Sequence, residues 1–162
     1  MSCLAAAAVL ASTSPCLADE EPDAPRGVVG VHGNYVTGGD DGERGDGGGI
    51  GLRLGSHDTA LWGAVAVFEE VVGSYSHVLD RHVGRVAGGA GMGLQFIVIG
   101  VYGHGHVGYG FGAPGDGITF DLGVSASLLL FDDVRPGLHL EYVHIFDELK
   151  MLTAGVRVDF ML

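Results

Sequence analysis

In the segment "ITFDLGVSASLLLF", residues 118–131, every second position from Ile118 to Leu130 is apolar, and the positions between them are polar or glycine as far as Ser127. A period of two residues is typical of a β-strand, in which successive side chains point to opposite faces. Tilted by ~45°, a strand of this length climbs about 28 Å, which is close to the thickness of the hydrocarbon core of a membrane. The apolar face consists of Ile118, Phe120, Leu122, Val124, Ala126, Leu128 and Leu130.

Seven further segments alternate in the same way, so the sequence predicts eight strands. Because an uninterrupted strand cannot switch faces, a change of parity near residues 94–96 predicts a tight turn there. The seventh segment loses its parity after Tyr142, which predicts a bulge near His144. The strands are expected at residues 27–37, 48–56, 60–70, 83–93, 97–111, 117–131, 136–146 and 150–162. Gly-rich and acidic stretches predict long loops at 37–48, 69–82 and 112–117.

The chain shows no helical period, and 30 of its 162 residues are glycine, which disfavours helices. The fold class is therefore predicted to be all-β. The expected architecture is a single antiparallel, up-and-down, eight-stranded β-barrel that occupies residues 27–162. Residues 19–26 form an acidic N-terminal tail.

Residues 1–18 have the features of a secretory signal peptide. A short apolar run at 3–11 is followed by small residues, and "CLA" before Asp19 resembles a cleavage site. The run is too short to span a bilayer. Both cysteines, Cys3 and Cys16, lie in this segment, so the mature chain is expected to contain no disulfide.

The alternation allows two barrels of opposite polarity. A soluble, lipocalin-like barrel that binds a small apolar ligand would bury its apolar face, whereas a membrane barrel would turn that face to lipid and keep a polar lumen. The length of the strands and the single lysine of the chain favour the membrane barrel. Aromatic residues near strand ends favour it too, since they suit girdles at the two interfaces. They are Tyr35, Trp62, Phe68, Tyr109, Phe111, Phe120, Phe131, Phe146 and Phe160.

The formal net charge of −12 comes from the N-terminal tail and the segments between the strands, whereas the strands themselves are balanced. The chain has no basic stripe, so nucleic acid is not expected as a partner. Charges inside a lumen must pair. The sequence therefore predicts a lumen network in which Arg53, Arg85 and Arg157 pair with Asp121, Glu141 and Asp159.

The last strand, "LTAGVRVDFML", is apolar at alternate positions and has Phe160 near its end. In pattern and length the mature chain resembles the small eight-stranded outer-membrane barrels of bacteria, of the OmpA transmembrane domain and OmpX type. The resemblance implies a porin-like protein of the cell envelope, with transmembrane strands, periplasmic termini and extracellular long loops. It also implies outer-membrane lipid and the barrel-assembly machinery as partners, and we expect a monomer.

Two constellations could carry chemistry. His104 and His106 share one face of a strand, a spacing that can chelate a metal, but the sequence gives no third ligand. Some small outer-membrane barrels modify lipid A, and a deacylase of this kind would use a serine, a histidine and an acid. The candidates here are Ser125, Ser127, His139 and Glu141. The His-x-Ser pattern of the deacylases is absent, and polar residues that fill the lumen explain both groups more simply.

We therefore expect a non-enzymatic outer-membrane barrel with no cofactor. Its role would be structural, adhesive or protective of the cell surface, through acidic extracellular loops. The alternatives are a lipid A-modifying barrel enzyme and the secreted soluble barrel.

Overall fold

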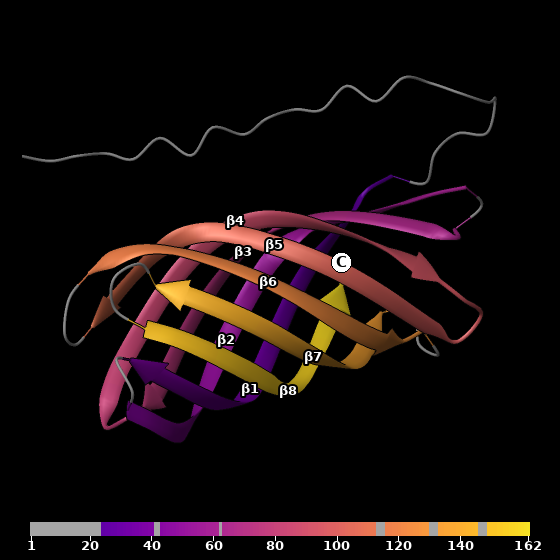
Figure 1. Cartoon of the computed structure of the whole chain (residues 1–162). Coiled ribbons are helices and arrows are strands. Elements are labelled where there is room, and N and C mark those ends of the chain that lie inside the picture. Colours follow the sequence, from indigo (N-terminus) through magenta and orange to yellow (C-terminus); the bar gives the residue numbers. More distant parts are fainter. Residues whose placement is uncertain (1–23, 41–42, 62, 113–115, 130–132, 146–148) are drawn as a thin grey trace, which may run out of the picture.

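The protein is a closed barrel of eight antiparallel strands (Figure 1). The computed structural model describes residues 24–40, 43–61, 63–112, 116–129, 133–145 and 149–162. The predicted signal peptide and most of the acidic tail lie outside these residues. Within them, no helix is long and apolar enough to cross a membrane. The strands are β1 (Arg26–Asp40), β2 (Glu43–Ala60), β3 (Val65–Val78), β4 (Arg81–Gln95), β5 (Ile99–Gly112), β6 (Gly117–Leu128), β7 (Val134–Ile145) and β8 (Leu149–Met161).

Each strand pairs with its neighbours in sequence, and β8 closes the barrel against β1. The paired positions wind around the barrel as a spiral. A path of paired residues that starts at Val28 and crosses all eight strands returns to β1 at Gly38, ten residues further on. With the usual strand spacings, this stagger tilts the strands by about 40° from the barrel axis.

The two ends of the barrel differ. The terminal end holds both ends of the barrel chain, since the Leu162 amide donates a hydrogen bond of 2.8 Å to the Gly27 carbonyl. The turns at 61–64 and 96–98 lie at this end too. The opposite end carries the β1–β2 and β3–β4 hairpins. The β3–β4 turn consists of Leu79 and Asp80, each with a φ of 54°.

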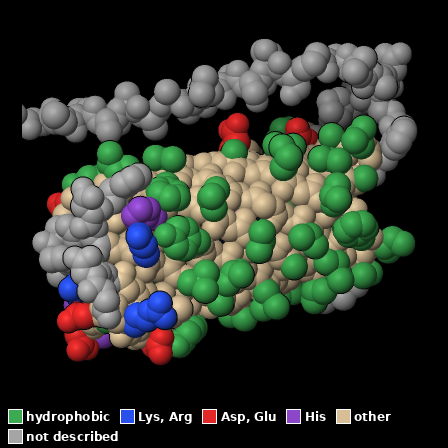
Figure 2. Space-filling model, in the orientation of Figure 1, with side chains coloured by type: hydrophobic (Ala, Val, Ile, Leu, Met, Phe, Trp, Pro, Cys, Tyr) green, Lys and Arg blue, Asp and Glu red, His purple; other side chains and the backbone are tan. Residues whose placement is uncertain are grey.

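The apolar faces of the strands point outward, as the membrane-barrel interpretation predicts. Leu122, Val124 and Val156 are 61%, 54% and 62% exposed, whereas Glu141 and Arg157 are 6% and 7% exposed. Hydrophobic side chains are spread over the wall of the barrel, and most charged side chains in this view gather at one end (Figure 2). Because a soluble barrel would bury the apolar face, the soluble alternative is wrong.

The outer wall also carries a ring of aromatic residues. The register and the tilt place five of them at about the same height near the opposite end, which suits one membrane interface. These five are Tyr35, Tyr75, Tyr109, Phe120 and Tyr142. The predicted girdle residue Phe68 instead points inward and is buried. Trp62, Phe131 and Phe146 lie outside the described residues.

Two predicted loops are wrong, because strands run through them. In the segment 37–48, β1 and β2 stay paired as far as Asp40 and Glu43. In the segment 69–82, β3 and β4 stay paired as far as Val78 and Arg81. Most outward side chains near these tips are polar, so the apolar alternation that marks a strand fades there. The third predicted loop is confirmed in place, since β5 ends at Gly112 and β6 begins at Gly117.

The turn predicted between the fourth and fifth strands is confirmed, at 96–98. The third strand begins at Val65 rather than at residue 60, because β2 continues to Ala60 and the chain then turns, with Gly63 at a φ of 79° and the Ala64 amide donating a hydrogen bond of 3.1 Å to the Leu61 carbonyl. The bulge predicted near His144 is wrong. β7 pairs with β8 without interruption, and Val143 and Ile145 keep the lumen-facing parity.

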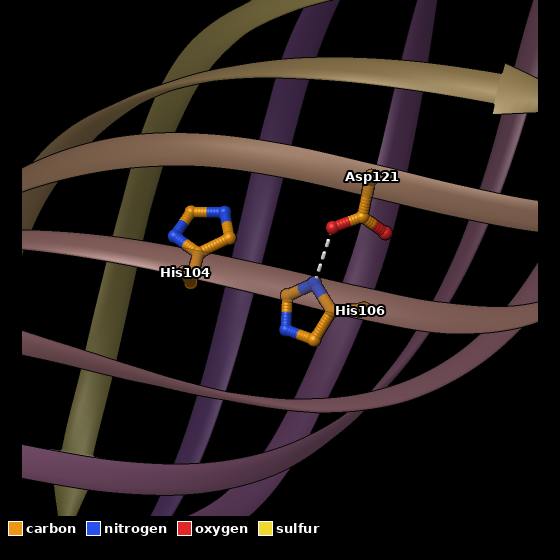
Figure 3. A group of neighbouring side chains, drawn as sticks. All are labelled: His104, His106 and Asp121. Atoms are coloured by element: carbon orange, nitrogen blue, oxygen red, sulfur yellow. Dashed lines mark hydrogen bonds and ion pairs between the residues drawn. The ribbon is translucent and has the colours of Figure 1, made fainter.

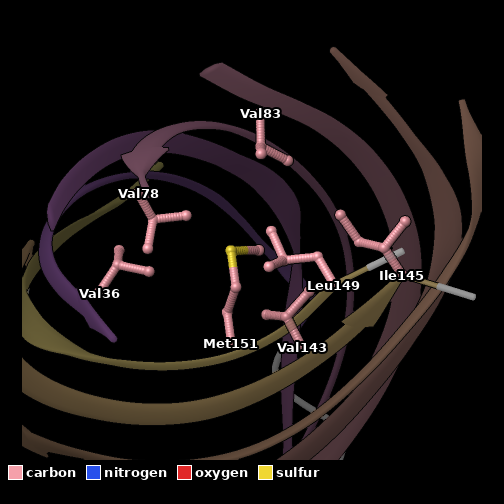
Figure 4. Packing of buried hydrophobic residues seen from close by; sticks show 7 residues of the cluster. All are labelled: Val36, Val78, Val83, Val143, Ile145, Leu149 and Met151. Carbon is pink, nitrogen blue, oxygen red and sulfur yellow. The ribbon is translucent and has the colours of Figure 1, made fainter. Parts of the chain in front are cut away.

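Val143 and Ile145 point inward and pack in an apolar cluster that fills the lumen at the opposite end (Figure 4). We call this cluster the apolar plug. A second, smaller apolar cluster of Ala66, Phe68 and Tyr102 lies toward the terminal end. The polar part of the lumen lies between the two clusters. The apolar plug consists of Val36, Val78, Val83, Val143, Ile145, Leu149 and Met151.

Candidate functional site

The lumen contains a network of buried ion pairs between strands far apart in sequence. Arg85 Nη1 lies 2.5 Å from Asp121 Oδ2 and 2.7 Å from Glu141 Oε1. Arg157 Nη2 lies 2.9 Å from Asp159 Oδ2. All six residues that the sequence assigns to the lumen network lie in it, because their positions in the strands all face inward.

Sequence reasoning missed one acid of this network. Glu70 counted there as a loop charge, but β3 continues past it and its side chain is buried. Glu70 pairs with Arg53, whose Nε also lies 3.6 Å from Asp159 Oδ1. The alternation of Phe68, Glu70 and Val72 on one face was the available signal for its position.

His106 lies between two carboxylates of the network. Its Nδ1 is 2.5 Å from Asp121 Oδ1, and its Nε2 is 2.9 Å from Glu70 Oε1. With His106 charged, the network would hold four positive charges, and these would balance four carboxylates. The positive charges would be those of Arg53, Arg85, Arg157 and His106, and the carboxylates those of Glu70, Asp121, Glu141 and Asp159. Such pairing is what a buried set of charges requires.

The four candidate catalytic residues lie close together, but they do not form a relay. Ser125 and His139 are direct partners in the β6–β7 register. However, the hydroxyls of Ser125 and Ser127 accept hydrogen bonds of 3.0 and 3.2 Å from Arg157. Neither ring nitrogen of His139 has a hydrogen-bond partner among the described residues. An activated serine needs a base within hydrogen-bond reach, which this arrangement does not provide.

The candidate metal ligands His104 and His106 lie side by side in the lumen, with ring centroids 5.1 Å apart. Asp121 on β6 joins them, so that one ligand atom from each residue lies within 4.8 Å of the other two (Figure 3). Asp121 is a candidate third ligand, which the sequence alone did not supply. A second histidine pair, His32 and His139, lies elsewhere in the lumen with ring centroids 5.2 Å apart.

A small cavity of about 20 Å³ lies in the lumen toward the terminal end. Its walls include Arg53, Glu70, Tyr102, Arg135 and Arg157. A space of this size holds about one water molecule. It does not amount to a channel through the barrel, as expected for eight strands whose interior is filled by side chains.

No family model and no curated protein matches this chain. Solved structures do match it in fold. Neisserial surface protein A superposes with a TM-score of 0.70 at 9% identity, over 83% of this chain and 96% of that one. Ail, the attachment invasion locus protein of Yersinia pestis, superposes with a TM-score of 0.65 at 12% identity, over 85% and 99%. The outer membrane enzyme PagL gives 0.52 at 10% identity, over 81% and 98%.

The chain has the fold of the small eight-stranded outer-membrane barrels. This confirms the resemblance that its pattern and length predict. Identities of 9–12% carry the fold and not the activity. The predicted location in a bacterial outer membrane agrees with this fold and with the lipid-facing exterior.

Proposed function

We propose that this protein is a non-enzymatic barrel of the bacterial outer membrane that acts at the cell surface as a structural and adhesive element. The terminal end would face the periplasm, and the β1–β2 and β3–β4 hairpins would stand outside the cell. One observation carries the proposal above the others. The lumen is closed by side chains, so at the end that would face outside the cell a partner would meet the exposed polar groups of the hairpins.

Charge on these hairpins supports a surface role. Among the described residues, the exposed carboxylates at the opposite end are those of Glu43, Asp46, Asp80 and Asp116, against the exposed basic side chains of Arg44 and Lys150. All four lie beyond the aromatic ring, and those of Glu43, Asp46 and Asp80 lie on hairpins whose strands stay paired up to the turn. A rigid, preorganised surface loses less entropy on binding than a flexible loop would. A cationic partner surface suits this arrangement.

Location can be tested in cells that produce the full chain. We expect the protein in the outer-membrane fraction, and we expect its band to shift on gels when the sample is heated, because heat opens the closed barrel. Recovery of the chain in the soluble periplasmic fraction would contradict the proposal.

The surface role needs a separate experiment. Cells that produce the full chain should attach better to a polylysine-coated surface than cells without it. The variant Glu43→Gln/Asp46→Asn/Asp80→Asn/Asp116→Asn should remove this gain at an equal level of surface protein. The matched control is Asp58→Asn/Asp133→Asn, which removes two carboxylates exposed at the terminal end and should leave attachment unchanged. Equal attachment with and without the chain would reject the adhesive role.

A lipid A-modifying enzyme is the second candidate, since PagL shares the fold. The candidate serines are buried and bonded to Arg157, away from the outer wall where lipid lies. We therefore expect the mass of lipid A to stay unchanged when the chain is overproduced. A loss of acyl chains that disappears in Ser125→Ala/Ser127→Ala would favour the enzyme instead.

A further inference from the structure

We propose that His104, His106 and Asp121 form a binding site for a divalent transition-metal ion, of the zinc or copper type, inside the lumen. His104 and His106 are two residues apart on β5 and point to the same side. Asp121 lies directly opposite His106 in the β5–β6 register. The fold thus brings two imidazoles and one carboxylate together on adjacent strands (Figure 3).

Neighbouring groups orient the ligands as in protein metal sites. His106 Nε2 faces Glu70 Oε1 at 2.9 Å, which leaves Nδ1 for the ion. Asp121 Oδ2 accepts a hydrogen bond from Arg85, which leaves Oδ1 for the ion. Ligating histidines usually donate their second nitrogen to a carboxylate, and ligating carboxylates are usually hydrogen-bonded in turn.

His104 provides an observation of its own. The Nε2 side of its ring is turned toward His106 and Asp121, whereas Nδ1, which is buried and has no hydrogen-bond partner among the described residues, points away from them (Figure 3). A methyl group at Gly123 would collide with the His104 ring, and one at Gly89 would collide with the His106 ring. Glycines on the two flanking strands therefore leave the space that both imidazoles occupy.

The ligand set indicates the class of ion. Two imidazoles and a carboxylate suit zinc, copper or nickel, whereas magnesium and calcium prefer sites made only of oxygen. Bonds of ~2.1 Å to the metal place tetrahedral ligand atoms about 3.4 Å apart. The ion would replace the proton held between His106 Nδ1 and Asp121 Oδ1, and that proton would pass to solvent. A water molecule would supply the fourth ligand.

The ion would reach the site from the terminal end, past the small apolar cluster, whose Phe68 and Tyr102 line the cavity there. The apolar plug closes the lumen at the opposite end. At the terminal end, Glu70 lines the cavity and also contacts His106. Cavity and site are therefore separated by a single side chain.

The test uses the full mature chain, refolded in detergent, with Co²⁺ as the probe. We expect one ion per chain, a visible absorption band typical of nitrogen and oxygen ligands, and displacement by Zn²⁺. His104→Gln should weaken binding at least tenfold, and Glu70→Gln should weaken it ~10–100-fold through the orientation of His106. Folding of each variant is checked by the heat-induced gel shift, and His104 offers the mildest change because its Nδ1 has no partner to lose.

The matched control is a second histidine pair at the surface. His77 and His82 face each other across the β3–β4 hairpin, with ring centroids 4.7 Å apart, and both are exposed. His77→Gln/His82→Gln should leave Co²⁺ binding unchanged. Loss of binding in this double variant, equal binding in His104→Gln, or no binding to the unaltered chain would each overturn the proposal. The result does not depend on whether the hairpins mediate adhesion.

Discussion

Arg85 is the residue whose substitution we expect to lower the stability of the barrel most. It is buried and pairs with both Asp121 and Glu141. Arg85→Met would leave two buried carboxylates without this partner, so we expect the free energy of unfolding to fall by about 3–5 kcal/mol. The measurement is urea unfolding in lipid, followed by the gel shift. Arg44→Met, at an exposed position, should change stability by less than ~0.5 kcal/mol. Equal effects of the two substitutions would show that the lumen network contributes little.

Asp80 offers a prediction of the opposite sign. Leu79 and Asp80 both have a φ of 54° in a two-residue hairpin turn, a conformation that favours glycine or asparagine. Since the left-handed region costs a non-glycine residue ~1–2 kcal/mol, we expect Asp80→Gly to stabilise the barrel by about 0.5–1 kcal/mol. Ser56→Gly, in the ordinary strand conformation of β2, should instead destabilise it by a similar amount. A destabilised Asp80→Gly variant in the same urea assay would contradict the turn assignment.

At the scale of single strands, the outward face of β6 should show a gradient of tolerance to charge. Val124 lies near the middle of the apolar belt, and Leu128 ends the strand at the terminal end. Val124→Lys should cost ~2–4 kcal/mol of folding free energy in lipid, and Leu128→Lys only ~0–1 kcal/mol. The difference should shrink in detergent micelles, which adapt to a charged surface. Equal costs in lipid would mean that the belt is not centred where we place it.

The existence, order and polarity of the strands could be predicted from the sequence, because lipid imposes a strict alternation on any strand that crosses it. The extent of the strands could not. The segments 37–48 and 76–82 pass beyond the aromatic ring, where outward polar residues and glycines hide the strand pattern, and within the belt the outward Glu69 and Gly73 interrupt the apolar face of β3. The inward orientation of the Val143 and Ile145 side chains was missed for a related reason. Alternation alone does not show whether an apolar side chain faces the lipid or packs in an apolar plug inside the lumen.

The candidate site shows the same limit. Alternation alone assigns Arg85, Asp121 and Glu141 to the lumen. Which acid each arginine meets depends on the closure and stagger of the barrel, because Arg85 on β4 reaches across to β6 and β7. Glu70 was missed because it stood at the end of the predicted strand 60–70, where the overlapping predicted loop 69–82 took its charge. The carboxylate that completes the metal cluster appears only when β5 and β6 are placed in register.

For the whole molecule, we expect no steady ion conductance in planar bilayers. The apolar plug and the charged network block the lumen at two separate levels. Val36→Ala/Val143→Ala/Met151→Ala should therefore remain closed, although it should lower stability through the cavity it creates. A conducting unaltered chain would contradict a filled lumen, and a conducting triple variant would show that the network alone does not seal the barrel.

The pairing of β1 with β8 joins residues 26–40 to residues 149–161, the first and last strands of the described chain. Until that seam forms, both strands carry a row of unsatisfied backbone groups that would bind any other strand within reach. A chain that stops short of its final strand cannot settle for a smaller ring, because the stagger of all eight sets the circumference. Completion of the seam is thus the step at which an aggregation-prone sheet becomes an inert cylinder, and a nascent chain needs protection until then.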